Sequence, residues 1–148
     1  MKPKIFLDTN ILLDLLLERP GYELTAEILQ MHDDKKITVC QSSLSLANIA
    51  FVLRKEFGKH LIQPTIKMLC AVTEIISLEE SAIQEATLLD GPDFEDIMQL
   101  VCAVHGNCDI LVTRNIKDFK ISSSLLPGFK KPAVYTPESF LLEFGEGH

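Results

Sequence analysis

The chain is poor in aromatic side chains and in basic residues, and these two shortages limit what its core and its binding surfaces can be. Aromatic residues make up 7% of the 148 residues, whereas apolar residues make up 47%, so the core must consist mainly of Leu, Ile, Val and Ala. The formal net charge of −7 argues against a sequence-specific DNA-binding protein with a broad basic face. It does not argue against a nuclease, because bound cations can invert the local sign of the charge.

Metal-binding patterns of cysteine and histidine are also missing. The cysteines form no C-x-x-C pair and the histidines show no mutual ligand spacing, which argues against a zinc cluster or a histidine-based metal site. The apolar sequence surroundings of the cysteines predict reduced, buried thiols in a cytosolic protein. The residues concerned are Cys40, Cys70, Cys102 and Cys108, and His32, His60, His105 and His148.

Targeting and nucleotide-binding motifs are not visible either. Only three apolar residues lie between Lys4 and Asp8, and the longest uncharged stretches are too short to span a bilayer, so we expect a cytoplasmic protein without membrane contact. The sequence has no P-loop, dinucleotide-binding glycine motif or G-x-S-x-G elbow. Its length predicts one domain over residues 1–144, and we expect residues 145–148 to be a disordered or tag-derived tail.

Apolar runs alternate with helical patterns along the chain. Strands are predicted at 4–8, 37–40, 74–78, 110–112 and 133–135, and helices at 11–16, 22–34, 44–57, 60–72, 80–89, 94–105 and from 137 onward. Pro127-Gly128 and Pro132 predict a loop. This alternation is typical of an α/β protein, and we expect a single three-layer α/β/α domain with a central, mainly parallel sheet of 4–5 strands.

The first strand runs into Asp8-Thr9-Asn10. An Asp in this place can simply cap the following helix. Three polar groups directly after a buried strand instead favour a functional site, because ligands of open α/β sheets bind at the carboxyl ends of the strands.

A second acidic group, Asp93-Phe94-Glu95-Asp96, opens a predicted helix. Acids stabilise the first turn of a helix through its dipole, but three acids in four residues exceed that need. We predict Asp96 as a metal-binding acid and keep Asp93 as a supporting residue or a helix cap.

A third polar group follows the strand at 110–112. Thr113, Asn115 and Asp118 are typical turn residues, yet they lie where a metal ion or a water can be held at the sheet edge. Arg114 and Lys117 flank this edge, and we predict that they contact phosphates. Asp118-Phe119 alternatively has a structural role, with Phe119 anchoring a loop.

Asn48 lies in the strongly apolar segment 46–53 and needs hydrogen-bonding partners if it is buried. It is either a satisfied core amide or a neutral member of the polar site.

Repulsion supplies the physical reason for a metal. Two carboxylates about 4 Å apart repel by ~4 kcal/mol at an effective dielectric near 20, and a cation between them removes this cost.

The three polar segments together resemble the PIN-domain nucleases, including the VapC-type toxins of bacterial toxin–antitoxin pairs. The matching segments are Phe6-Leu7-Asp8-Thr9-Asn10-Ile11-Leu12-Leu13, Asp93-Phe94-Glu95-Asp96 and Leu111-Val112-Thr113-Arg114-Asn115-Ile116-Lys117-Asp118-Phe119. The resemblance covers nearly the whole chain. It implies an α/β/α fold and an Mg²⁺- or Mn²⁺-dependent endoribonuclease that hydrolyses RNA phosphodiester bonds.

The resemblance also assigns residues. Asp8 and Asp96 match the family's metal-binding acids, and Asn115 matches a further catalytic position that holds Asp or Asn. The family's remaining acid, usually Glu, falls at or near Asn48, which cannot supply a negative charge. Asp93, Glu95 or Asp118 then compensates, or the site holds one metal, or activity is reduced.

Partners follow from the resemblance as well: an RNA substrate, an antitoxin protein and a second copy in a homodimer. Two alternatives stay open. A PIN-like module that binds RNA or protein without catalysis is favoured by Asn48. A phosphohydrolase with Asp8 as nucleophile usually requires a second Asp two residues later, where this chain has Asn10.

Overall fold

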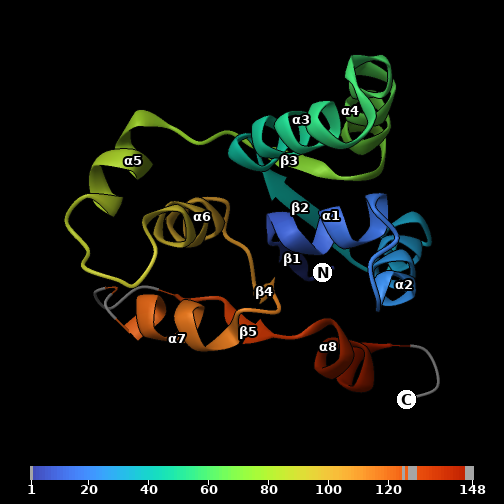
Figure 1. The fold of residues 1–148 in the computed structure, drawn as a ribbon. Coiled ribbons are helices and arrows are strands. Elements are labelled where there is room, and N and C mark those ends of the chain that lie inside the picture. Colours follow the sequence, from blue (N-terminus) through green and yellow to red (C-terminus); the bar gives the residue numbers. More distant parts are fainter. Residues whose placement is uncertain (1, 125, 127–129, 146–148) are drawn as a thin grey trace.

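The computed structural model describes residues 2–124, 126 and 130–145, and in these residues five strands form one sheet. The strands are β1 (Lys4–Leu7), β2 (Thr38–Ser42), β3 (Glu74–Ile76), β4 (Ile110–Val112) and β5 (Ala133–Tyr135). Every neighbouring pair is parallel, and the order is β3-β2-β1-β4-β5. The predicted α/β class and five-stranded parallel sheet are therefore confirmed (Figure 1).

Two layers of helices cover the sheet because its side chains alternate between the faces. Ile5 and Leu7 of β1 belong to one apolar cluster, whereas Phe6 belongs to the other. The first cluster includes residues of α1 (Thr9–Leu16), α2 (Tyr22–Asp33), α3 (Ser43–Phe57), α4 (Ile62–Val72) and α8 (Pro137–Phe144). The second includes residues of α5 (Glu80–Ala86), α6 (Phe94–His105) and α7 (Ile116–Ser124).

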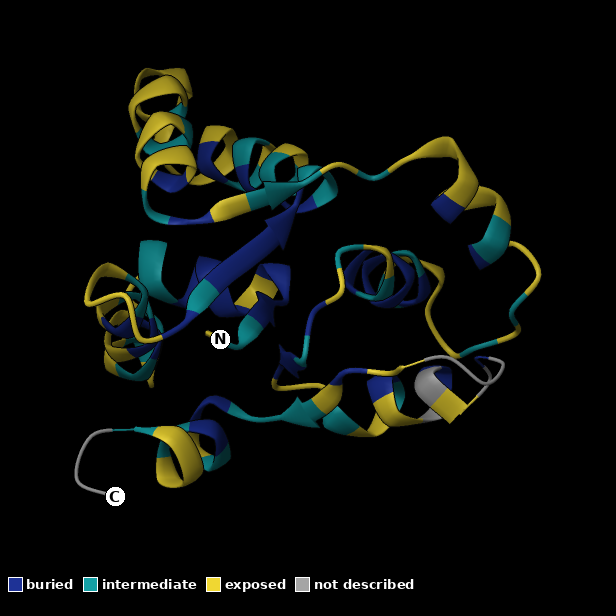
Figure 2. Ribbon diagram, turned by 180° about the vertical axis from the view of Figure 1, so that it is seen from behind, coloured by how far each residue is buried: buried dark blue, intermediate teal, exposed yellow. Residues whose placement is uncertain are grey.

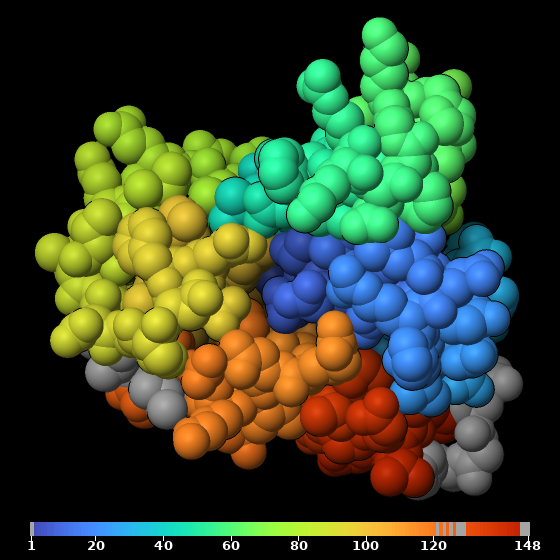
Figure 3. Space-filling model, viewed as in Figure 1, coloured from blue at the N-terminus to red at the C-terminus, as the bar shows by residue number. Residues whose placement is uncertain are grey.

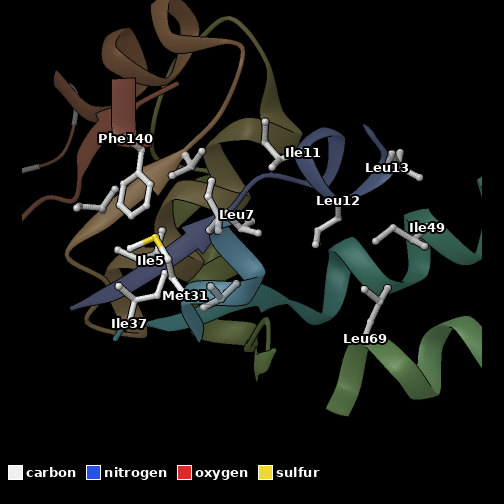
Figure 4. Packing of buried hydrophobic residues seen from close by; sticks show 14 of the residues in the cluster. Ile5, Leu7, Ile11, Leu12, Leu13, Met31, Ile37, Ile49, Leu69 and Phe140 are labelled. Atoms are coloured by element: carbon white, nitrogen blue, oxygen red, sulfur yellow. The ribbon is translucent and has the colours of Figure 1, made fainter. Parts of the chain in front are cut away.

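The aliphatic core expected from the composition is present. Figure 4 shows the first cluster, in which Ile5, Leu7 and Phe140 pack together, and Leu12, Ile49 and Leu69 extend it between α1, α3 and α4. Complete burial of each such side chain contributes about 1.5–3 kcal/mol. The residues of strands β1, β2 and β4 are almost all buried (Figure 2).

Local signals determine where several helices begin and end. The Ser42 hydroxyl accepts a hydrogen bond from the Ser45 backbone N–H at 3.1 Å and so caps α3. Gly58 ends α3 with a positive φ of 80°, a conformation that glycine adopts without strain. Thr136 and Ser139 form a reciprocal capping box at the start of α8, and Pro137 is the first residue of that helix.

The structure corrects four expectations. The segment after Asn115 is not a loop but the helix α7, which contains both Asp118 and the buried Phe119. The predicted helix at 60–72 is divided into a 3₁₀ turn (Lys59–Leu61) and α4. Helix α5 ends at Ala86 rather than at 89. Cys70 is exposed on α4, whereas the other three cysteines are buried as expected.

Some predictions concern residues that are not described. The turn at Pro127-Gly128 lies outside the described residues, as do positions 146–148 of the expected tail. Gly145 is described, and its backbone N–H donates to the Leu141 carbonyl at 2.8 Å at the end of α8. Within the described part of the chain, every helix is too short or too polar to cross a membrane.

Candidate metal-dependent active site

The strand order places the ends of β1 and β4 side by side at the carboxyl edge of the sheet. The chain passes from β1 to β2 and β3 on one side, and then returns to β4 and β5 on the other. The Asp8 backbone N–H donates to the Val112 carbonyl at 3.1 Å, and the Thr113 N–H donates to the Tyr135 carbonyl at 2.9 Å. This topological switch point is where open α/β sheets bind their ligands, as the sequence predicted for Asp8.

Asp8 is buried at this edge, with 5% of its surface exposed. It directly precedes α1, yet among the described residues its carboxylate makes no capping bond to that helix. The Thr113 hydroxyl instead donates to Asp8 Oδ2 at 3.0 Å. Burial raises the pKa of Asp8, and the Thr113 hydrogen bond opposes this rise. Asp8 is thus a carboxylate turned toward the sheet edge, and capping does not explain it.

Asp96 reaches the same place from the first turn of α6. Burial, followed by the charges of Asp8 and Asp93, raises the pKa of Asp96 to about 7. The Asn115 amide donates to Asp96 Oδ2 at 3.0 Å and to Asp118 Oδ2 at 3.1 Å, and it joins the segment after β4 to α6. The three residues predicted as catalytic therefore converge, and their carboxylates repel one another.

Asp93 has a structural function that the sequence left open. It precedes α6 and its Oδ1 accepts the Asp96 backbone N–H at 3.1 Å, which is the geometry of an N-terminal cap. The cap also fixes the first turn of α6 and hence the place from which the Asp96 side chain extends.

A cavity of about 290 Å³ opens over these carboxylates. In Figure 3 the start of α1, in dark blue, reaches the surface among α3 in green, α6 in yellow and α7 in orange. Most of the cavity wall is polar or acidic, and its apolar members come from α1 and α3. The lining residues are Asp8, Thr9, Asn10, Leu13, Asn48, Phe51, Val52, Asp93, Glu95 and Asp96.

Asn48 belongs to this polar site rather than to the core. It is half-buried on α3, and its Nδ2 donates to Glu95 Oε1 at 2.6 Å across the gap between α3 and α6. Of the two readings of Asn48, the structure thus supports the neutral member of the site. The pairing of Asn48 with Glu95 could not be predicted from local patterns, because the two residues are 47 positions apart and lie on different helices.

A buried hydrogen-bond network beneath the cavity was not predicted. Gln99 Nε2 donates to Thr9 Oγ1 at 2.8 Å and to Ser45 Oγ at 2.9 Å, and Gln99 Oε1 accepts from Ser42 Oγ at 2.5 Å. Thr9 and Ser45 hydroxyls are also 2.8 Å apart. These hydrogen bonds tie the ends of β1 and β2 to α6. Each of the residues is at most 6% exposed, so water does not compete for the bonds.

The two basic residues beside the site differ in their contacts. Arg114 forms a two-pronged ion pair with the buried Asp14 of α1, at 2.8 and 3.0 Å. Its guanidinium therefore holds the segment after β4 against α1, and its predicted phosphate contact stays a prediction. Lys117 is exposed on α7, so its predicted phosphate contact stays a prediction.

The donor atoms are of the type that Mg²⁺ and Mn²⁺ prefer. The convergent groups are carboxylate and amide oxygens, and neither histidine nor cysteine lines the cavity. In the described part of the chain, no three His, Cys, Asp or Glu side chains are already close enough together to cage an ion. The fit to Mg²⁺ therefore rests on the chemistry of the donor atoms and not on a preformed cage.

A larger cavity of about 600 Å³ lies elsewhere, between α2 and α4. It is lined largely by apolar and solvated side chains, and none of the convergent carboxylates reaches it. We therefore place the chemistry at the smaller, acidic cavity.

The fold is thus a parallel α/β sheet with acidic side chains that converge at its switch point. The family model described as "PIN domain" matches residues 4–117 of this sequence. The chain belongs to the PIN-domain family.

Several solved structures have a fold similar to that of this chain. The VapBC2 complex of Rickettsia felis bound to a DNA fragment from its promoter has a matching chain with a TM-score of 0.66 and 22% identity, over 90% of this chain and 98% of that one. A toxin–antitoxin complex from Klebsiella pneumoniae matches with a TM-score of 0.60 and 23% identity, over 90% of this chain and 97% of that one. The DNA-bound VapBC of Salmonella typhimurium matches with a TM-score of 0.63 and 15% identity, over 91% of this chain and 98% of that one. No curated protein matches the sequence significantly.

Proposed function

We propose that this protein is a metal-dependent endoribonuclease that hydrolyses RNA phosphodiester bonds, and that it is the toxin of a toxin–antitoxin pair in the cytoplasm. The observation that carries the proposal is the convergence of Asp8 and Asp96 at one cavity, with Asn115 hydrogen-bonded to Asp96, from segments far apart in the sequence. Membership of the PIN-domain family and the fold of the VapBC toxins support it.

Each residue has a defined part in the proposed reaction. Asp8 and Asp96 would hold Mg²⁺ or Mn²⁺, and the bound ion would supply a Lewis acid for the phosphate and for the attacking water. Thr113 fixes the Asp8 carboxylate through its hydroxyl, and Asn115 orients Asp96 through its amide. Thr9 supports the site from the buried network below.

Asp118 and Asn10 complete the set. Asp118 accepts from the Asn115 amide and so helps to set its orientation. Asn10 is exposed on the cavity wall, where it can hydrogen-bond to the RNA or to waters of the cation. Lys117, exposed on α7, supplies a positive charge for the phosphate backbone.

Protein partners are part of the proposal. The complexes similar in fold contain an antitoxin, and exposed apolar side chains on α3 and α4 of this chain support a protein contact beside the cavity. Phe51, Phe57 and Met68 are the exposed members, and Phe51 also lines the cavity. Co-purification with the product of an adjacent small reading frame tests the antitoxin, and light scattering tests the homodimer.

The decisive test is metal-dependent RNA cleavage by Asp8→Asn and Asp96→Asn variants. We expect both to lose cleavage while circular dichroism shows an unchanged fold. Full activity in both variants would refute the assignment.

A PIN-like binding module without catalysis is the second candidate, and Asn48 in place of an acid favours it. Calorimetric titration with Mn²⁺ separates the two candidates, because a protein that ignores millimolar metal cannot be a metal-dependent nuclease. Failure to trap a phospho-aspartate at Asp8 would exclude a phosphohydrolase that uses this residue as its nucleophile.

A further inference from the structure

The α3 wall of the cavity presents the amide of Asn48, which is hydrogen-bonded to an acid of α6. We infer that Glu95 of α6 is a third carboxylate of the metal site and that Asn48 holds it in place. This inference rests on the proposed metal-dependent function and names a further residue of the metal site.

The contact between the two residues carries the inference. Glu95 lies in the first turn of α6, where a long, exposed side chain would ordinarily extend into water. It is directed instead toward α3, because Asn48 Nδ2 donates to Glu95 Oε1 at 2.6 Å. Both residues line the same cavity as Asp8 and Asp96. An amide N–H that donates to an ionised carboxylate makes a strong, charge-assisted bond, so the carboxylate is held at the cavity wall.

The other acids near the site have different partners. Asp93 caps α6 by accepting the Asp96 backbone N–H. Asp118 accepts from the Asn115 amide and is not among the residues that line the cavity. Glu95 is thus the acid whose described partner is the α3 amide itself.

Glu95 adds negative charge to the metal site. An asparagine on α3 contributes no negative charge, whereas Glu95 adds one carboxylate to those of Asp8 and Asp96 on the same cavity. The three carboxylates are not close enough to cage a bare ion. Mg²⁺ keeps several waters, and a carboxylate at the cavity wall stabilises such an ion through its charge and through hydrogen bonds to those waters.

The test measures Mn²⁺ affinity by calorimetry on the full chain, without reference to cleavage. Glu95→Gln should weaken Mn²⁺ binding by about 10- to 100-fold, as the loss of supporting groups does at other metal sites. Adding Asn48→Glu to Glu95→Gln restores one carboxylate and one amide in exchanged positions, and we expect this double variant to recover most of the affinity.

Glu138→Gln is the matched control. Glu138 is the second residue of α8, as Glu95 is the second residue of α6, and it is exposed and absent from the cavity lining. Its variant should bind Mn²⁺ like the wild type. Urea unfolding in the presence of a chelator shows whether each variant is folded before it is titrated.

The outcomes separate the two claims. Wild-type affinity in Glu95→Gln together with lost binding in Asp8→Asn would overturn the Glu95 inference and leave the proposed function standing. If Glu95→Gln weakens Mn²⁺ binding and the double variant does not restore it, the role assigned to Asn48 would be overturned. A wild-type protein that does not bind Mn²⁺ would overturn both the inference and the proposed function.

Discussion

Replacing Asp96 by asparagine should stabilise the metal-free protein at alkaline pH. Burial and the charges of Asp8 and Asp93 raise the pKa of Asp96 from 3.8 to about 7 in the folded state. The folded protein therefore holds this proton more tightly than the unfolded chain does. Stability from this group is fully present below pH ~4 and is lost as the pH rises toward about 7.

The size of the effect follows from the same pKa. A rise of this extent corresponds to at most about 4 kcal/mol. Asp96 is only half-buried, and solvent screening reduces the figure to about 1–2 kcal/mol. Asp96→Asn removes the charge and keeps an oxygen that can accept from the Asn115 amide. We therefore expect its free energy of unfolding to exceed that of the wild type by about 1–2 kcal/mol at pH ~8 and to match it at pH ~4.

Urea unfolding with a chelator present, at both pH values, measures this difference. Glu138→Gln is again the control, because it removes an acid from the first turn of a helix away from the cavity. If Asp96→Asn is no more stable than the wild type at the alkaline pH, the carboxylates do not repel one another and the physical reason for a cation disappears. If the gain is equal at both pH values, the ionisation of Asp96 is not its cause.

Three further predictions concern the groups that position the site. Thr113→Val removes the hydroxyl that donates to Asp8, so it should destabilise the protein by about 1–3 kcal/mol and weaken Mn²⁺ binding, as calorimetry would show; unchanged affinity would contradict this positioning role. Arg114→Met leaves Asp14 buried with a weaker partner, and we expect a loss of about 1–3 kcal/mol in urea unfolding; RNA binding that falls without a loss of stability would instead support a phosphate contact. Gln99→Leu leaves buried hydroxyls without their amide partner and should cost about 1–3 kcal/mol, which thermal unfolding at several scan rates would reveal.

Local patterns were sufficient to predict the sheet and the edge that carries the site. A short apolar run that ends in a carboxylate, such as the one before Asp8, identifies both a buried strand and the end at which it presents its acid. Helix α7 was missed because its sequence from Ile116 to Ser124 is rich in serine and lysine and follows a typical turn. Phe119 is buried and α7 contacts α6 and β5, so packing rather than local preference stabilises this helix.

The unpredicted contacts all join segments that are distant in the sequence. Asn48 and Glu95 meet only because α3 and α6 flank the same end of the sheet. Arg114 was expected to contact phosphate because it flanks the acidic edge; in the structure its guanidinium also pairs with the buried Asp14 of α1, which the sequence did not predict. Such pairings depend on tertiary geometry, which the spacing of residues along a chain does not contain.

The position of β1 in the middle of the sheet has a consequence for biosynthesis. Its two neighbours, β2 and β4, are both translated later, and Asp8 meets Thr113 only after 105 further residues have been made. A nascent chain that is still shorter than this has an incomplete catalytic pocket. A ribosome making the proposed nuclease is therefore not exposed to a working copy of its own product until the segment that carries Thr113 and Asn115 has emerged.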